Sequence, residues 1–279
     1  MAFDYSSLAS HQDIPLYEEM TSLDVAEAAK AGAHVIVVAG ATEQHAGHLP
    51  LGTDTYQGLE TARRAAFDLA KEGIPVLVGP AIPFGPKPFL SESPKDFPGT
   101  INLSHSTLKL MIEEVCRQLV GQGFPVVYLL CSHAENDPVL QIVAKEVSET
   151  TDASVVTLQW LVGIQPGYKG LMNSTRPQGH AGEGETARML ASAPHLVRMD
   201  QARSYHPHLP ADIAPNDKMP YLGGAIGRYK YPAKVFEGFE DGLWGDPQNA
   251  TAEVGEKSYS LINTWVCAAI RSEWKLWNS

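Results

Sequence analysis

The chain has 279 residues, of which 44% are hydrophobic, and a formal net charge of −11 at pH 7. The hydrophobic share allows a sizeable core, while the acidic balance argues against nucleic-acid binding. Three widely spaced cysteines form no disulfide framework, which favours a reducing compartment. The first residues lack the character of a signal peptide, and no apolar run is long enough to span a bilayer. We therefore expect a cytoplasmic protein that binds neither nucleic acid nor a membrane.

Short apolar runs alternate with segments of helical period along most of the chain. In chain order, the expected elements are a strand at residues 34–39, a helix at 55–71, a strand at 75–78, a helix at 106–120, a strand at 126–131, a helix at 137–150, a strand at 154–159, a helix at 183–193 and a helix at 251–274. Residues 195–248 are rich in Pro, Gly, His and Tyr, and we expect loops there with room for a hairpin. Without a linker or repeat, a single domain over residues 1–279 is predicted.

This alternation of strands and helices predicts an α/β fold, with a mainly parallel sheet covered by helices on both faces. In such sheets, binding sites form beyond the carboxyl ends of the strands. Glu43 and His45 directly follow the first expected strand, and His133 and Glu135 follow the third. Two polar groups about ninety residues apart are therefore expected to meet at one edge of the sheet.

Glu43, His45 and Asp54 lie in the stretch GATEQHAGHLPLGTD. Glu43 and His45 are two residues apart, so in extended backbone their side chains project to the same side. Asp54 can return to them after the intervening turn. Carboxylates combined with imidazole suit Zn²⁺, Mn²⁺, Fe²⁺ or Co²⁺. The alternative is a helix-capping aspartate among ordinary surface polar residues.

Three later motifs add polar groups: 96–100 (DFPGT), 133–136 (HAEN) and 180–186 (HAGEGET). Each has a structural alternative, namely a turn, a capped helix start, and glutamates that complement a helix dipole. Taken together, the candidate ligands are mostly oxygen with two or three imidazoles. That set suits a two-metal site better than a structural zinc site, which favours cysteine. A bridging carboxylate would hold two ions, and Asp54 is the natural candidate.

These motifs, in this order, resemble those of the creatininase (creatinine amidohydrolase) family. The matching stretches are residues 40–54, 97–100, 133–136, 180–186 and 242–247. The resemblance implies a three-layer α/β/α sandwich, a homohexamer and two divalent metal ions, Zn²⁺ and/or Mn²⁺, with Fe²⁺ or Co²⁺ left open. It implies that Glu43 and His133 bind one ion, that His45 and Glu185 bind the other, and that Asp54 bridges them.

The same resemblance assigns the remaining roles. His180 is implied as the catalytic acid/base, and Glu135 as a metal ligand or a second proton-handling group. Trp160 lies near a position that contacts substrate in the family. Arg176 and Asp96 stand where creatininase itself has a tryptophan and a histidine, which suggests a more polar substrate pocket.

The leading hypothesis is therefore a two-metal hydrolase that opens a small cyclic substrate at an amide C–N bond by means of a metal-bridged hydroxide. One alternative on the same metals is hydrolysis of a lactone, or C–C cleavage of an oxidised cyclic polyol such as a keto-inositol. The other alternative is a non-catalytic, oligomeric binding protein that is stabilised by its metals.

Overall fold

A computed structural model describes residues 4–87, 97–176, 178–208, 232–238 and 241–278. Its central sheet has four parallel strands in the order β2-β1-β5-β6. Their bounds are His34–Ala39 (β1), Val76–Ile82 (β2), Val126–Cys131 (β5) and Ser154–Gln159 (β6). Two short strands, Gly85–Pro86 (β3) and Asn102–Leu103 (β4), pair separately.

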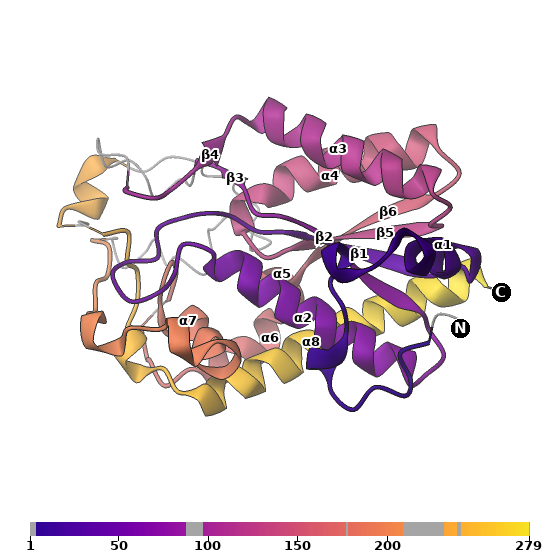
Figure 1. Ribbon diagram of the computed structural model, residues 1–279. Coiled ribbons are helices and arrows are strands. Elements are labelled where there is room, and N and C mark those ends of the chain that lie inside the picture. The colour runs from indigo at the N-terminus through magenta and orange to yellow at the C-terminus, as the bar shows by residue number, and fades with distance from the viewer. Residues whose placement is uncertain (1–3, 88–96, 177, 209–231, 239–240, 279) are drawn as a thin grey trace.

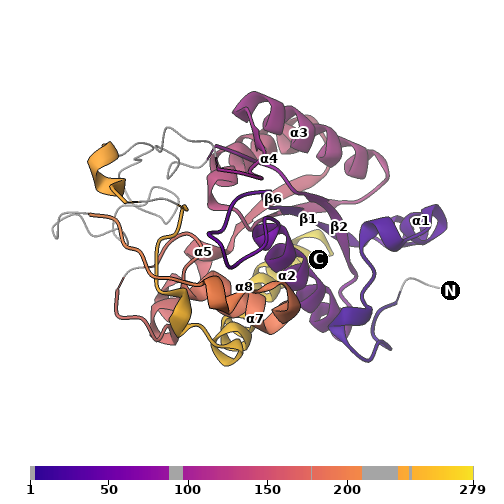
Figure 2. The same cartoon turned by 60° about the vertical axis from the view of Figure 1, so that its left-hand side comes forward.

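Helices cover both faces of this sheet, as Figures 1 and 2 show. On one face lie α3 (His105–Gly121) and α4 (Asp137–Thr150), and α1 (Ser22–Lys30) packs its buried side into the same core. On the other face lie α2 (Thr53–Ala70) and α8 (Ala252–Trp277), joined by α7 (Glu183–Ser192). The short helices α5 (Trp160–Gly163) and α6 (Gln165–Tyr168) follow β6. The expected α/β sandwich is therefore observed.

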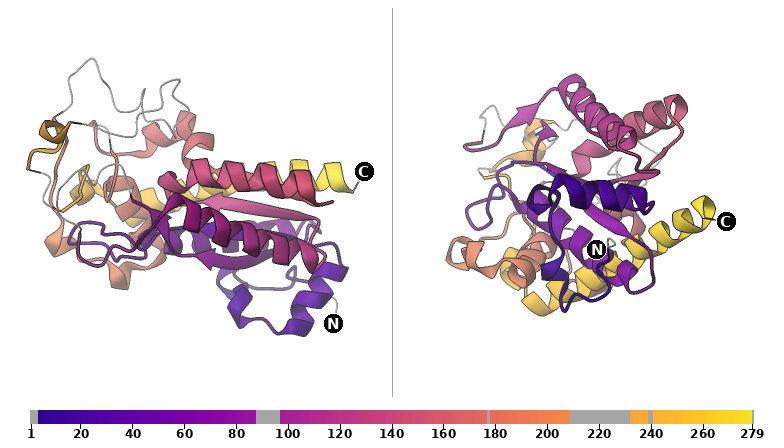
Figure 3. Two further views of the ribbon diagram at one scale, coloured as in Figure 1. Left: turned by 90° about the horizontal axis from the view of Figure 1, so that it is seen from above. Right: turned by 45° about the vertical axis from the view of Figure 1, so that its right-hand side comes forward.

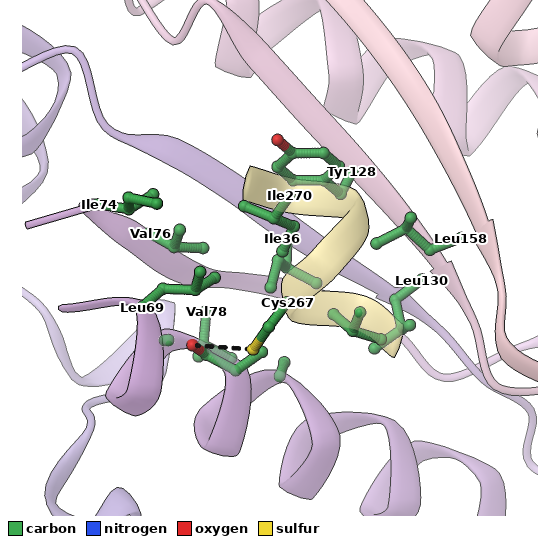
Figure 4. Packing of buried hydrophobic residues seen from close by; sticks show 14 of the residues in the cluster. Ile36, Leu69, Ile74, Val76, Val78, Tyr128, Leu130, Leu158, Cys267 and Ile270 are labelled. Atoms are coloured by element: carbon green, nitrogen blue, oxygen red, sulfur yellow. Dashed lines mark hydrogen bonds between the residues drawn. The ribbon is translucent and has the colours of Figure 1, made fainter. Parts of the chain in front are cut away.

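The core has one apolar cluster on each face of the sheet. Figure 4 shows one of them, in which Ile36, Val78 and Leu130 of three neighbouring strands pack against Cys267 and Ile270 of α8. Helix α8 extends along this face towards the carboxyl terminus (Figure 3). All three cysteines are buried and unpaired, as expected for small apolar side chains.

Most predicted elements agree with the structure within one to three residues. Strand β2 continues to Ile82, beyond the predicted end at residue 78, and α2 begins at Thr53 rather than residue 55. Helices α1, α5 and α6 were not predicted. Within the described part of residues 195–248, an antiparallel bridge joins Tyr205 to Gly245, while residues 209–231 lie outside it. The single domain stays a prediction.

No helix within the described ranges is both long and apolar enough to cross a membrane.

Helix α2 packs unusually close to the sheet, and a glycine permits this approach. A Cβ on Gly58 would lie 2.3 Å from Val38 Cγ1 on β1 and 2.7 Å from Ser132 Oγ. Asp54 is four residues earlier on the same face of the helix. The close packing at Gly58 therefore brings the Asp54 carboxylate to the carboxyl edge of the sheet.

The other end of the sheet contains a buried histidine whose ionisation should affect stability. His34 is fully buried, its Nδ1 lies 2.8 Å from the Tyr128 hydroxyl, and its Nε2 has no hydrogen-bond partner. Burial lowers the pKa of His34 from 6.5 to about 4. Between these values the unfolded chain binds the proton more tightly, so the folded state loses stability as pH falls. The loss from this residue reaches roughly 3 kcal/mol.

We expect His34→Gln to lose less stability than the original protein when the pH is lowered from 7 to 4.5. Urea unfolding at both pH values measures the difference, and only the pH dependence of the unfolding free energy is compared. His195→Gln, at an exposed histidine, serves as the control. An unchanged pH dependence in His34→Gln would contradict the prediction.

Candidate metal centre

The order of the strands in the sheet determines where the candidate site lies. The chain passes from β1 to β2 on one side and then returns to β5 on the other side of β1. Ligands of parallel sheets bind at such a change of direction, outside the carboxyl ends of the two strands. Glu43 and His45 follow β1, and His133 follows β5. Asp54 and Glu185 join them from the first turns of α2 and α7.

These five side chains form two groups that share Asp54. In the first group, His133 Nδ1 lies 3.4 Å from Glu43 Oε2 and 3.1 Å from Asp54 Oδ2. In the second, His45 Nε2 lies 3.4 Å from Asp54 Oδ1 and 3.7 Å from Glu185 Oε2. Within each group the potential ligand atoms all lie within 4.8 Å of one another. The two oxygens of Asp54 therefore face different groups, as the predicted bridge requires.

Several of these atoms are buried without a hydrogen-bond partner, which tests whether metal ions fit here. Glu43 Oε2, His45 Nε2 and Asp54 Oδ2 are all in this state. A buried polar atom left unsatisfied costs about 1–3 kcal/mol, and these three point towards neighbouring ligand atoms. Carboxylate oxygens and imidazole nitrogens are ligands for Zn²⁺ and Mn²⁺. The residues present thus fit divalent cations.

Hydrogen bonds around the groups orient the predicted ligands. His45 Nδ1 donates to the carbonyl oxygen of Glu43 at 3.0 Å, which leaves Nε2 to face the carboxylates. The backbone N–H of Ala181 donates to Glu185 Oε2 at 2.7 Å. Such outer contacts are typical of metal sites, where they select the histidine tautomer and fix the ligand direction.

Electrostatics within the cluster favour opposite charges side by side. Burial opposes charge on His45 and His133, but nearby carboxylates outweigh it and raise their pKa values to about 10 and about 9. Burial raises the pKa of Glu43 to about 7, whereas His45 and His133 hold the pKa of Asp54 below its usual range despite its burial. Without metal the imidazoles are therefore protonated at neutral pH, and cation binding must release these protons.

His180 occupies a different environment from His45 and His133. Its Nε2 donates to the Gln44 carbonyl oxygen at 2.5 Å and lies 3.8 Å from Glu43 Oε1. Burial lowers the pKa of His180 to about 3, so its ring is neutral. A neutral imidazole beside the cluster can exchange a proton with a bound substrate. With Glu43 and His45 it also forms a third group of potential ligand atoms, so the geometry suits either role.

The loop that carries His180 is held by residues 242–246. Trp244 N donates to the His180 carbonyl oxygen at 2.8 Å, and Gly179 N donates to the Trp244 carbonyl oxygen at 2.9 Å. Leu243 and Trp244 are both buried. The sequence indicated residues 242–247 only as a family stretch. The structure shows that they fix the backbone around His180, and that Gln44 contacts its ring.

The remaining predicted residues lie outside the two groups that share Asp54. Glu135 is half-buried on the short helix after β5, and its charge contributes to the raised pKa of His133. Trp160 is 1% exposed and packs in the core, with its ring under the Arg188 guanidinium. Arg176 is exposed in the loop before His180. Asp96 lies outside the described residues. In this conformation Trp160 is not open to a ligand, so its predicted substrate contact gains no support.

Comparison with known proteins agrees with this geometry. A family model described as "Creatininase: Creatinine amidohydrolase" matches residues 18–270. The mycofactocin precursor peptide peptidase of Mycobacterium tuberculosis is 26% identical over 257 residues, covering 90% of each chain. The creatinine amidohydrolase of Pseudomonas putida is 27% identical over 248 residues, covering 84% of this chain and 87% of its own. A solved structure, "Creatininase Mn", superposes with a TM-score of 0.72 at 25% identity, covering 94% of this chain and 99% of that one.

Proposed function

The chain belongs to the creatininase family of metal-dependent hydrolases, and we propose that it hydrolyses an amide C–N bond in a small cyclic substrate with two divalent metal ions. Because the family consists of enzymes, the alternative of a non-catalytic binding protein is set aside. The keto-inositol and lactone alternatives remain predictions from the sequence.

The observation that carries the proposal is the shared position of Asp54. Glu43 and His133 lie on one side of its carboxylate, and His45 and Glu185 lie on the other. One carboxylate between two ligand groups suits a pair of ions about 3.5–4 Å apart. We assign Mn²⁺ or Zn²⁺ to these positions, since the donors are carboxylates and imidazoles.

When bound, such ions polarise the scissile carbonyl and lower the pKa of a coordinated water towards neutrality. The chain's own residues would do the rest. His180, neutral at rest and beside Glu43, would first accept the proton that the attacking water loses and would then donate it to the departing nitrogen. Glu135, which follows the ligand His133 by two residues, would serve as a second proton-handling group at the edge of the site.

A second candidate substrate is a peptide, because one relative is named as a peptide peptidase and aligns over 90% of this chain. Hydrolysis of a peptide and hydrolysis of a cyclic amide both cleave an amide C–N bond. Both would use metal ions to polarise the carbonyl group and an acid to protonate the departing nitrogen. They differ in the size of the substrate that the site must admit.

Metal analysis followed by substrate screening tests the proposal. We expect about two Mn²⁺ or Zn²⁺ ions per chain, and loss of hydrolysis after chelation with recovery when metal is added back. The screen would contain cyclic amides, short peptides, lactones and keto-inositols. Full activity of rigorously metal-free protein would refute the proposal, and cleavage of only lactones or keto-inositols would refute the amide assignment.

We also propose that the chain works as a cytoplasmic homohexamer. Support for assembly comes from the exposed apolar side chains of Leu51 and Ile101, whose backbones hydrogen-bond to Glu43 and Thr42. Sedimentation analysis of the purified protein would measure the subunit number.

A further inference from the structure

Behind the metal groups, the guanidinium of Arg188 is buried on α7. Only 2% of the residue is exposed. Its Nε donates to Gln57 Oε1 at 2.6 Å, and its Nη1 donates to the Tyr168 hydroxyl at 2.9 Å and to Ser258 Oγ at 3.3 Å. The guanidinium carbon also lies 5.1 Å from the centre of the Trp160 ring. Arg188 thus has a fixed direction, and the helix that bears Glu185 is tied to its surroundings through it.

Gln57 completes a connection between α2 and α7. Its Oε1 accepts from Arg188, and its Nε2 donates to the backbone oxygen of Glu185 at 3.2 Å. Gln57 follows Asp54 by three residues on α2, and Arg188 follows Glu185 by three residues on α7. Residues three apart lie on the same face of a helix, one above the other. The Gln57–Arg188 contact is therefore a second layer, one turn behind the predicted ligands Asp54 and Glu185.

The charge of Arg188 points to the same connection. Among the described residues, no carboxylate forms a salt bridge with it, although burying an unpaired charge is costly. Burial opposes the charge of Arg188, but the electrostatic influence of Tyr168 and then of Glu185 outweighs it and raises the pKa of the guanidinium above its usual value. Burying a guanidinium among neutral hydrogen-bond partners costs more free energy than burying an apolar side chain of similar size. The presence of Arg188 here is explained if its fixed direction and its charge help to position Glu185.

We propose that Gln57 and Arg188 are positioning residues that hold Asp54 and Glu185 at the separation needed for the second metal ion. This inference rests on the proposed function, because it presumes that both ligand groups bind metal. The first group depends less on the contact, since Glu43 and His133 are carried by the ends of β1 and β5. Because Asp54 is shared by both groups but Glu185 is not, loss of the contact should weaken the ion at His45 and Glu185 more than the ion at Glu43 and His133.

The test compares Arg188→Met with the double variant Gln57→Met/Arg188→Met. Metal-stripped protein is titrated with Mn²⁺, bound and free ions are counted by electron paramagnetic resonance, and thermal unfolding of the metal-free protein is recorded. Arg188→Met leaves Gln57 without its donor, which should lower stability. In the double variant the unpaired Gln57 amide is also removed, so part of the lost stability should return, although Tyr168 and Ser258 still lack the Arg188 donor. In both variants we expect affinity for one of two Mn²⁺ ions to fall about 10–100-fold.

Arg64→Met is the matched control. Arg64 also lies on α2, donates to Glu60 and Glu256, and stacks on an aromatic ring, that of Tyr259. It joins α2 to α8 rather than to α7. We expect this variant to change thermal stability while both Mn²⁺ ions bind with their original affinity.

The outcomes separate this inference from the proposed function. If the unaltered protein binds fewer than two Mn²⁺ ions, the two-metal proposal itself fails. If it binds two, and the double variant binds both with unchanged affinity, Gln57 and Arg188 are structural only and the inference fails. Equal weakening of both ions would likewise overturn the selective role.

Discussion

Replacement of Asp54 by asparagine is expected to remove both metal ions and to lower kcat/KM by at least about 10³-fold. The two oxygens of Asp54 face different ligand groups, so one substitution weakens both. An amide offers one neutral oxygen in place of two charged ones and cannot bridge two cations. A 10³-fold loss corresponds to about 4 kcal/mol of transition-state stabilisation, which is the order expected when metal assistance is withdrawn.

Metal content and hydrolysis of the same preparation should be measured together for Asp54→Asn. Glu60→Gln is the matched control, because Glu60 is also a buried acid on α2 but pairs with His11 and Arg64, away from the cluster. We expect Glu60→Gln to retain its metals. If Asp54→Asn kept two tightly bound ions, the bridging assignment would be wrong, whatever its activity.

The fold and the position of the site could be predicted because both depend on short-range patterns. β-branched runs ending at turn residues mark the four strands, and in a parallel sheet the residues just beyond the strand ends gather at one edge. Glu43, His45 and His133 were found in this way, close to the ends of two patterned strands. The starts of α2 and α7 then add Asp54 and Glu185 to the same edge, and the structure brings all five side chains together.

The features that could not be predicted depend on contacts between distant segments. The sequence placed Trp160 near substrate, but it gave no sign that the Arg188 guanidinium of α7 lies over the Trp160 ring and that both side chains are buried. A glutamine and an arginine, each three residues after a predicted ligand, were the only local signal of the second layer. That signal has meaning only once α2 and α7 are known to be neighbours.

Replacement of His180 by glutamine is expected to lower kcat by about 10²–10⁴-fold, the range for loss of a general acid or base, while two metal ions remain bound. Its Nε2 already has a partner in the Gln44 carbonyl oxygen, and its pKa of about 3 keeps the ring neutral without metal. His45 differs, because its Nε2 faces two carboxylates and has no hydrogen-bond partner.

His45→Gln is therefore the informative comparison, since the same change of side chain should have the opposite effect on metal content. We expect His45→Gln to lose one ion and His180→Gln to lose none, when both are analysed after dialysis against metal-free buffer. Loss of an ion from His180→Gln would show that His180 is a metal ligand. That result would agree with the third group of potential ligand atoms, which His180 forms with Glu43 and His45. The proton for the leaving nitrogen would then have to come from another group, for which Glu135 is the nearest candidate in sequence to the ligand His133.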